Sequence, residues 1–491
     1  MAVQSQAWAL SGGLDLISPA LQLPPGKAIL AQNYECHLAG GYRRIDGYTI
    51  YDGRSSGTPL AVTGSGPIRG VWEYNNVVYA FRDNAAGNAC VMHKSTSSGW
   101  VVVTTPALLA GGSFDFVNHN FTGHSGSLKM FGCNGLNKAF QFNGTTLSFL
   151  TTGMTSDVPS HVGVHKNHLF LSFTGGSVQH SAVGNPASWT LVTGAGEIGI
   201  GTEITGFSSM KGNSLAITGV NQISILYGTS SSNWDLKLFS PAIGAVSRTN
   251  AQMDSDLYFF NGEDLSSLTA TQAFGDFESA SVSAVVKPFI DARKNSIVGA
   301  TVNRDKNQYR LFFNDTTVLV GTIINRQIVG FSTWKLSHTA SYVTEKYMGC
   351  TDGSIMLMDS GTSFNGTAIQ SYLRLPFTNF NTPHRKKRFR KATLELEAGS
   401  QATLDYLADY NYGSGGSSSG SQTTVYGGGG FWDVANWDNF VWSSAVVSSA
   451  EAYLNGSGMN ISLLIVHTSA TDPAFTLQGV QLNYSLRGLN R

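Results

Sequence analysis

The residues that could carry out chemistry in this 491-residue chain occur as short motif matches whose surroundings do not fit the motif. Residues 194–199 (GAGEIG) match the glycine pattern of dinucleotide-binding loops. An extended, glycine-rich Ile-Gly-Ile-Gly-Thr run follows there, where such a site needs a helix. Residues 416–420 (GSSSG) match the nucleophile elbow of serine hydrolases, but they lie in a Gly/Ser-rich stretch without a strand before it or a helix after it. Neither match predicts a functional site.

Histidines and cysteines form no metal-ligand pattern. His161, His165 and His168 are spaced by four and three residues, and in strands this spacing directs the three side chains to different faces. We interpret them as loop or core histidines. The chain has four cysteines, which lie far apart: Cys36, Cys90, Cys133 and Cys350. Because there is no C-x-x-C motif, we expect four buried thiols and neither a disulfide scaffold nor a zinc knuckle.

Carboxylates are too scattered to indicate a hydrolase. The 31 Asp and Glu residues are scattered along the chain, and the S-x-D-x-G-x-x-W box that is typical of sialidase blades does not recur in it. Hydrolases built on propellers place carboxylates and an arginine cluster around a central channel. We therefore expect no enzymatic activity, no catalytic residue, no metal site and no cofactor.

The elements that would position any functional residue are β-strands arranged in a repeat. Runs of alternating β-branched and aromatic residues, such as residues 77–81 (VVYAF) and 309–313 (YRLFF), are bounded by Gly, Asn, Asp or Ser turns. Segments of this kind begin 41 to 52 residues apart, at Ile68, Phe114, His161, Thr205, Val246, Val298 and Tyr342. This spacing is the length of a four-stranded propeller blade. It predicts a propeller of six or seven degenerate blades over residues 68–372, and the alternative is a pair of stacked β-sandwiches.

Large aromatic residues fall late in most of these segments. We expect them to pack between neighbouring blades. They are Trp100, Trp189, Trp234 and Trp334, with Phe149 and Phe277 in the segments that lack Trp.

The composition supports an all-β fold with a polar, weakly charged surface. Charged residues make up 13 % of the chain, about half of the roughly 25 % that is typical. The 31 Lys and Arg residues balance the 31 Asp and Glu residues, so no overall basic field attracts nucleic acid. We find no secretory signal and no apolar run long enough to span a membrane, and we expect a soluble intracellular chain.

After residue 372 the repeat ends, and residues 373–491 are predicted to form a β-sandwich-like module. Residues 413–430 are a Gly/Ser-rich insertion that we expect to be flexible. The aromatic cluster Trp432, Trp437 and Trp442 follows it and indicates either a small core or an exposed anchoring tip. The only basic cluster leads directly into an alternating strand, residues 392–397. It contains Arg385, Lys386, Lys387, Arg388, Arg390 and Lys391.

The two ends of the chain resemble tail nozzle (tail tubular protein B-like) proteins of short-tailed phages. At the start, the resemblance is carried by residues 12–19 (GGLDLISP), 23–27 (LPPGK), 31–33 (AQN) and 40–47 (GGYRRIDG). At the far end it is carried by the Trp-Asp pairs at 432–433 and 437–438, by residues 475–482 (FTLQGVQL) and by Arg487-Gly. The repeat of blade length between the two ends completes the resemblance.

The resemblance implies a structural virion protein in the phage tail, assembled in the host cytoplasm. Such a subunit forms a homohexameric ring at the distal end of the tail, below an adaptor ring, and it gates and conducts genomic double-stranded DNA during ejection. Residues 1–67 would then be an extended segment that contributes to the platform and to ring docking. Tail fibres are a further partner, although this chain is somewhat short for the group, so we expect reduced insertions for docking them.

A conduit for DNA should not bind phosphates tightly, and a lumen poor in charge meets this need. We therefore expect the paired Arg43 and Arg44 and the basic cluster to face acidic surfaces of a neighbouring subunit or of the adaptor, and not the lumen. The alternative is an ordinary solvated basic face. At the level of function, the alternatives are another tail or head-completion subunit and a carbohydrate-binding or hydrolysing propeller.

Overall fold

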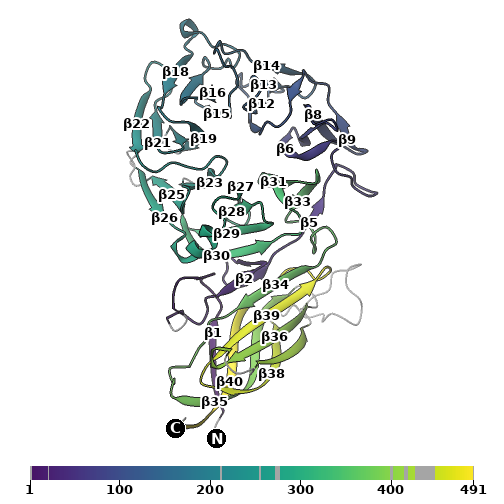
Figure 1. Cartoon of the computed structure of the whole chain (residues 1–491), viewed down its shortest axis with the longest axis vertical. Helices are drawn as coiled ribbons and strands as arrows, with labels where there is room; N and C mark the ends of the chain where they lie inside the picture. Colours follow the sequence, from purple (N-terminus) through teal and green to yellow (C-terminus); the bar gives the residue numbers. More distant parts are fainter. Residues whose placement is uncertain are drawn as a thin grey trace.

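The protein, described here by a computed structural model, consists of two joined β modules. Figure 1 shows a ring of radial sheets and, beside it, a two-layered sandwich that carries both chain ends. The predicted all-β fold, a propeller with a C-terminal β-sandwich-like module, is confirmed. The structure describes the chain except at residues 1–2, 20–21, 211–212, 254–255, 271–276, 399–401, 414–417, 426–447 and 490–491.

Seven blades form the ring in the described part of the chain. The ring closes because the inner strand of the seventh blade lies against that of the first. The inner strands are β6 (Ser65–Tyr74), β11 (Asp115–His119), β15 (His161–His165), β19 (Ile204–Met210), β23 (Ala251–Met253), β27 (Ile297–Asn303) and β31 (Ala340–Val343). Each lies at or close to a predicted segment start, and the alternative of two stacked sandwiches over this span is wrong.

Blades 1 to 5 are antiparallel sheets whose strands follow one another in the sequence. Blade 1 continues with β7 (Val77–Asp83), β8 (Ala89–Thr96), β9 (Gly99–Val102) and β10 (Leu108–Leu109), and blade 2 with β12 (Lys129–Cys133), β13 (Phe140–Phe142) and β14 (Leu147–Phe149). Blade 3 continues with β16 (His168–Phe173), β17 (Ser177–His180) and β18 (Gly196–Gly199), and blade 4 with β20 (Ser214–Gly219), β21 (Ile223–Tyr227) and β22 (Asp235–Ser240). Blade 5 continues with β24 (Asp256–Phe260), β25 (Leu265–Ala270) and β26 (Phe277–Ser281), and the single-turn helix α1 (Lys287–Asp291) leads to blade 6. Within these described residues no helix is long or apolar enough to cross a membrane.

The seventh blade is completed by a strand from far away in the sequence. Its strands β32 (Tyr347–Cys350) and β33 (Ile355–Met358) are followed at the outer edge by β5 (Tyr48–Ile50), which pairs antiparallel with β33. The propeller therefore also includes residues before position 68, the boundary that the repeat spacing predicts. The spacing could not reveal β5, because only its pairing with a strand about 300 residues later makes it part of a blade.

Blade 6 continues directly into the sandwich. Its outer strands are β28 (Gln308–Phe313), β29 (Thr317–Ile324) and β30 (Gln327–Lys335). The edge strand β30 pairs in parallel with the short strand β2 (Leu30–Gln32), through Gln32 and Thr333. Beyond β2 the same sheet contains β34 (Ile369–Arg374), β39 (Ile461–Ser469), β36 (Ala402–Tyr410) and β37 (Ser418–Val425). One continuous sheet thus joins the two modules.

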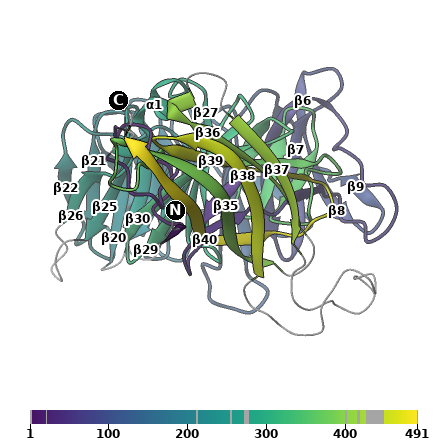
Figure 2. The ribbon, with the colours of Figure 1, turned by 90° about the horizontal axis from the view of Figure 1, so that it is seen from below.

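The second layer of the sandwich is built around β40 (Phe475–Leu489). This strand pairs with β1 (Gln4–Ala9), β4 (Tyr42–Arg44) and β35 (Arg385–Ala398), while β3 (Tyr34–Cys36) and β38 (Ser448–Gly458) complete the layer. The two layers share one core, to which Phe389, Leu394, Leu404, Tyr406 and Ile465 contribute. The N-terminal segment is therefore woven into the sheets of the sandwich. Figure 2 shows these long, twisted strands from below, in front of the propeller.

The Gly/Ser-rich stretch is partly a strand. Residues 418–425 form β37, which pairs along its length with β36 at the edge of the sheet. The prediction of a wholly flexible insertion over 413–430 is therefore wrong for this part, because small and hydroxylated residues suffice for an edge strand that needs no core of its own. Trp432, Trp437 and Trp442 lie outside the described residues.

Trp234 and Trp334 pack between blades as predicted, and the side chain of Phe277 lies outside the described residues. The ring of Trp234, just before β22 of blade 4, lies 4.1 Å from the ring of His180 and 4.8 Å from that of His168, both in blade 3. Trp334 of blade 6 is buried in a cluster with Met348 of blade 7. The four cysteines are free and buried, as expected.

Candidate functional site

The basic cluster forms the first half of strand β35, and strand alternation sorts its members. Phe389 and Ala392 point into the sandwich core and are buried, whereas Arg388 and Arg390 are exposed on the outer face. A bulge in the pairing between Phe389 and Lys391 keeps the outward and inward residues on their faces. Consecutive basic residues therefore have opposite environments.

Lys387 is a core residue and not an interface residue. It is fully buried, and its ammonium donates hydrogen bonds to the carbonyl oxygens of Thr382 at 2.7 Å, Met459 at 2.9 Å and Arg385 at 3.0 Å. Burial lowers the pKa of Lys387 to about 8. The expectation that Lys387 meets another protein is corrected, because its charge is used to satisfy three carbonyl groups of its own chain.

Of the five other cluster members, three are exposed, and Lys386 and Lys391 are half-buried. Lys391 forms an ion pair with Glu451 on the neighbouring strand β38. Arg385, Lys386, Arg388 and Arg390 have no carboxylate within 4 Å among the described residues, and we call these four the basic end of β35. The basic end starts where Arg385 pairs with Leu489, close to both chain termini and far from the propeller (Figure 1).

The opposite half of the same strand carries acidic side chains. Glu395 and Glu397 are exposed on the outer face of β35, and we call them the acidic end. Glu397 accepts a hydrogen bond from the Gln478 side chain at 3.0 Å, and neither carboxylate has a cationic partner within 4 Å in the described chain. At about 3.3 Å per residue, Glu395 lies roughly 23 Å from Arg388. The outer face of β35 therefore carries positive charge at one end and negative charge at the other, and we call it the polar outer face of β35.

Arg43 and Arg44 both bind within their own chain. Arg43 donates to Glu35 at 2.8 Å and forms a bidentate pair with Asp46 at 2.8 and 2.9 Å. Arg44 is completely buried, and its guanidinium donates to the carbonyl oxygens of residues 362, 469 and 472 at 2.7 to 3.0 Å. The proposed interface role of these two arginines is corrected, because Arg43 is paired within the N-terminal segment and Arg44 joins that segment to residue 362 and to the sandwich.

The clustered histidines are core residues, as interpreted. His165 and His168 are buried in blade 3, and so is His180, which the sequence analysis did not single out. Burial lowers the pKa of His165 and of His180 to about 4, so both are neutral near pH 7. Within the described residues, no group of His, Cys, Asp and Glu is arranged to hold a metal ion.

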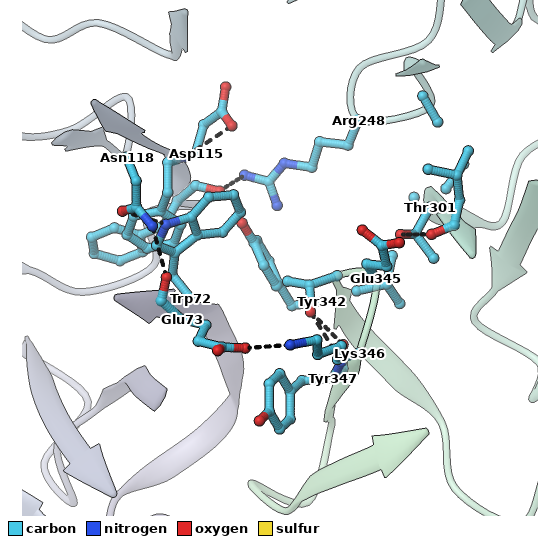
Figure 3. A pocket seen from close by; sticks show the side chains of 18 of the residues that line it. Trp72, Glu73, Asp115, Asn118, Arg248, Thr301, Tyr342, Glu345, Lys346 and Tyr347 are labelled. Carbon is cyan, nitrogen blue, oxygen red and sulfur yellow. Dashed lines mark hydrogen bonds and ion pairs between the residues drawn. The ribbon is translucent and has the colours of Figure 1, made fainter. Parts of the chain in front are cut away.

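A cavity of about 780 Å³ lies at the centre of the propeller. Its lining comes from the inner strands and adjoining turns of blades 1, 2, 5, 6 and 7. Figure 3 shows Trp72 and Tyr342 on its wall, with the guanidinium of Arg248 reaching towards them. Sequence reasoning missed these residues, because their convergence depends on ring closure, and the motif searches considered only local patterns.

Comparisons with known proteins give no family assignment. No family model matches the chain, and no curated protein matches it. Similar solved structures include virginiamycin B lyase from Staphylococcus aureus, which is 12 % identical with a TM-score of 0.44 over 60 % of this chain and 96 % of that chain. The WD40 repeats of RRP9 are 7 % identical with a TM-score of 0.43 over 63 % and 99 % of the two chains. The fold assignment rests on the pairing of this chain's own strands.

Proposed function

We propose that this chain is a structural virion protein, the tail nozzle subunit of a short-tailed phage, which assembles into a ring at the distal end of the tail. The ring gates and conducts the genome during ejection. The resemblance of both chain ends to nozzle proteins motivates this proposal, and the polar outer face of β35 is the observation that supports it best. Both ends of that strand carry charges that have no ionic partner among the described residues.

A ring of identical subunits uses a heterologous contact, in which one surface of each copy meets a different surface of the next. The basic end of β35 in one copy can face the acidic end of a neighbour, so that every copy uses both ends. The basic end has four cations and the acidic end two carboxylates. The surplus of positive charge is then available to an acidic face of the adaptor ring.

The path of the DNA in this proposal runs between subunits, along the axis of the ring. The centre of each propeller is a cavity of about 780 Å³ lined by side chains, which is the size of a small-ligand site and does not admit a duplex. The low content of charged residues, 13 %, suits a lumen that must release phosphates after they pass.

Charge reversal tests the contact between subunits. The test uses the phage that naturally encodes this chain. Its own copy of the gene is deleted, and the host cell expresses a variant in its place. Arg388→Glu combined with Arg390→Glu should lower the yield of infectious particles at least tenfold, because two acidic surfaces would then meet. Adding Glu395→Arg and Glu397→Arg to the same chain should restore the yield. The two contacting surfaces then carry opposite charges again, each reversed from its original sign. Lys237→Glu, on the exposed edge of blade 4, is the matched control and should leave the yield unchanged.

Failure of the fourfold variant to restore particles would contradict a contact between copies and would point to the adaptor as the partner of the basic end. Antibodies against the purified chain test the location separately. They should label the tip of the tail in electron micrographs of virions. Label confined to free protein or to the capsid would contradict the nozzle role.

A further inference from the structure

The cavity at the centre of the propeller has the size and the chemistry of a binding site. Its volume of about 780 Å³ lies within the roughly 300–1,000 Å³ of small-ligand pockets. All of its lining residues are described, and they include carboxylates, cations, amides and aromatic rings. The question is which of these groups are free to meet a ligand.

The carboxylates of the cavity are already engaged. Glu73 pairs with Lys346 at 3.2 Å, and Glu345 pairs with Arg304. Asp115 accepts hydrogen bonds from the backbone amides of residues 116 and 162 and lies 3.3 Å from the His161 ring nitrogen Nδ1. Two of the three lining cations are used in these pairs, so one cation is left.

Arg248 is the remaining cation. It is half-buried, and no carboxylate lies within 4 Å of its guanidinium in the described chain. One of its N–H groups donates to the Phe114 carbonyl at 2.9 Å, and its guanidinium carbon lies 5.4 Å from the centre of the Tyr342 ring. Because a guanidinium has five N–H donors, most of them remain available. These donors favour a planar anion that can accept two of them at once.

The backbone holds Arg248 in a costly conformation. Its φ is +64°, in the left-handed region that residues other than glycine rarely adopt. Its carbonyl oxygen accepts a hydrogen bond of 2.8 Å from the amide of Ala300 in the next blade, which fixes this geometry. Such local strain concentrates at ligand-binding positions.

The lining of the same cavity also includes an aromatic platform and several amides. The indole N–H of Trp72 donates to the Asn118 side chain at 2.9 Å, and its ring stacks on Phe116 with centres 5.7 Å apart, so the ring cannot rotate freely. The cavity wall also contains Asn75, Asn76, Asn250 and Gln252. The amide oxygen of Asn250 is buried and has no hydrogen-bond partner within the described residues. Amides can donate to and accept from hydroxyl groups, and a fixed indole offers a flat apolar surface.

We propose that this cavity binds a carboxylate-bearing sugar, such as a uronic acid within an acidic polysaccharide. Arg248 would bind the carboxylate, Trp72 would pack against the C–H face of a sugar ring, and the amides would bind its hydroxyl groups. An acidic peptide side chain would satisfy Arg248 but would leave the platform and the amides unused. This inference does not depend on the nozzle role, because it concerns a cavity complete within one chain.

The test titrates the purified full-length protein with oligomers of galacturonic acid and follows tryptophan fluorescence and saturation-transfer NMR. Oligomers of glucose serve as the neutral probe and oligomers of glutamate as the peptide probe. We expect binding of the uronic acid oligomers only. Arg248→Gln and Trp72→Ala should each weaken it at least tenfold, whereas Arg326→Gln, at an exposed turn between β29 and β30 and outside the cavity lining, should not. Circular dichroism of each variant separates loss of binding from loss of fold.

Equal affinity for the glucose oligomers, or no effect of Arg248→Gln in a folded variant, would overturn the assigned role of the guanidinium. Equal or tighter binding of the glutamate oligomers would overturn the sugar assignment in favour of a peptide. No binding of the uronic acid oligomers at roughly millimolar concentration would overturn the proposal as a whole.

Discussion

At the scale of single residues, the direction in which a side chain points decides what its charge does. Lys387 and Arg388 are adjacent in the sequence, yet the ammonium of Lys387 is enclosed by three carbonyl oxygens while the guanidinium of Arg388 lies in solvent. The same cluster of basic residues therefore contains one residue that stabilises the sandwich and others that are free to meet a partner.

Replacing these two neighbours should give opposite results. Lys387→Met removes the buried ammonium that donates to the carbonyl oxygens of residues 382, 385 and 459, and the free energy of unfolding in urea should fall by about 3 kcal/mol. Arg388→Ser removes an exposed side chain, and the free energy of unfolding should change by less than about 0.5 kcal/mol. Similar losses in both variants would contradict the inward orientation of Lys387.

The buried histidines of blade 3 should make folding sensitive to acid. The pKa of His180 is lowered from its ordinary value of 6.5 to about 4 by burial, so the unfolded chain binds its proton more readily than the folded chain. The stabilisation is complete above pH 6.5 and is lost as pH falls towards 4, by about 1.4 kcal/mol per pKa unit.

His180→Gln removes this titration and should flatten the dependence of the unfolding free energy on pH between 6.5 and 4, by roughly 2–3 kcal/mol over that window. His124→Gln, at an exposed loop position, is the control and should leave the slope unchanged. Denaturation curves at several pH values measure the effect. An unchanged slope in His180→Gln would contradict a lowered pKa of His180 in the folded protein.

At the scale of elements, the completion of the seventh blade depends on the three-residue strand β5. Its pairing with β33 brings Thr49 opposite Leu357, and the amide of Tyr51 donates to the Ile355 carbonyl at 2.7 Å. Thr49→Pro removes a backbone donor in the middle of this short strand. It should lower the free energy of unfolding by about 3 kcal/mol, while Thr49→Val should have little effect because that side chain is exposed. A folded, equally stable Thr49→Pro protein would show that the pairing of β5 does not stabilise the seventh blade.

The sequence revealed the elements whose partners are close by. The inner strands of the blades could be predicted, because each is followed at once by its hairpin partner and by the same turn residues. The alternation of Lys387 with Phe389 could also have shown that Lys387 points into the core. The pairing of β5 with β33 could not be predicted, since it joins segments about 300 residues apart. The same is true of the cavity around Arg248, which exists only when blades 1, 2, 5, 6 and 7 meet.

At the scale of the whole molecule, the two modules are continuous. The parallel pair Gln32–Thr333 connects the edge of blade 6 to the sheet of the sandwich. The side chain of Asn33 strengthens the joint by accepting a hydrogen bond from the Lys335 amide at 2.8 Å and donating one to the Gln370 carbonyl at 2.7 Å. A contact made by the sandwich therefore also sets the orientation of the propeller.

Assembly through exposed charges should weaken with salt. The Debye length falls from about 10 Å at 0.1 M to about 3 Å at 1 M ionic strength, so the attraction between the basic and acidic ends of β35 is screened. Sedimentation of tails isolated from virions should show release of this subunit on transfer from roughly 0.1 M to 1 M salt. Subunits that stay bound at the higher concentration would indicate an apolar interface in place of the ionic one.

The most direct test of the proposed function is averaged electron microscopy of the tail of the phage that encodes this chain. We expect a closed ring of copies at the distal end, with the outer faces of β35 in neighbouring sandwiches in contact. The lumen should be wide enough for a duplex and bounded by several subunits. Absence of the chain from the tail, or a single copy at the side of the tail in place of a ring, would contradict the nozzle assignment.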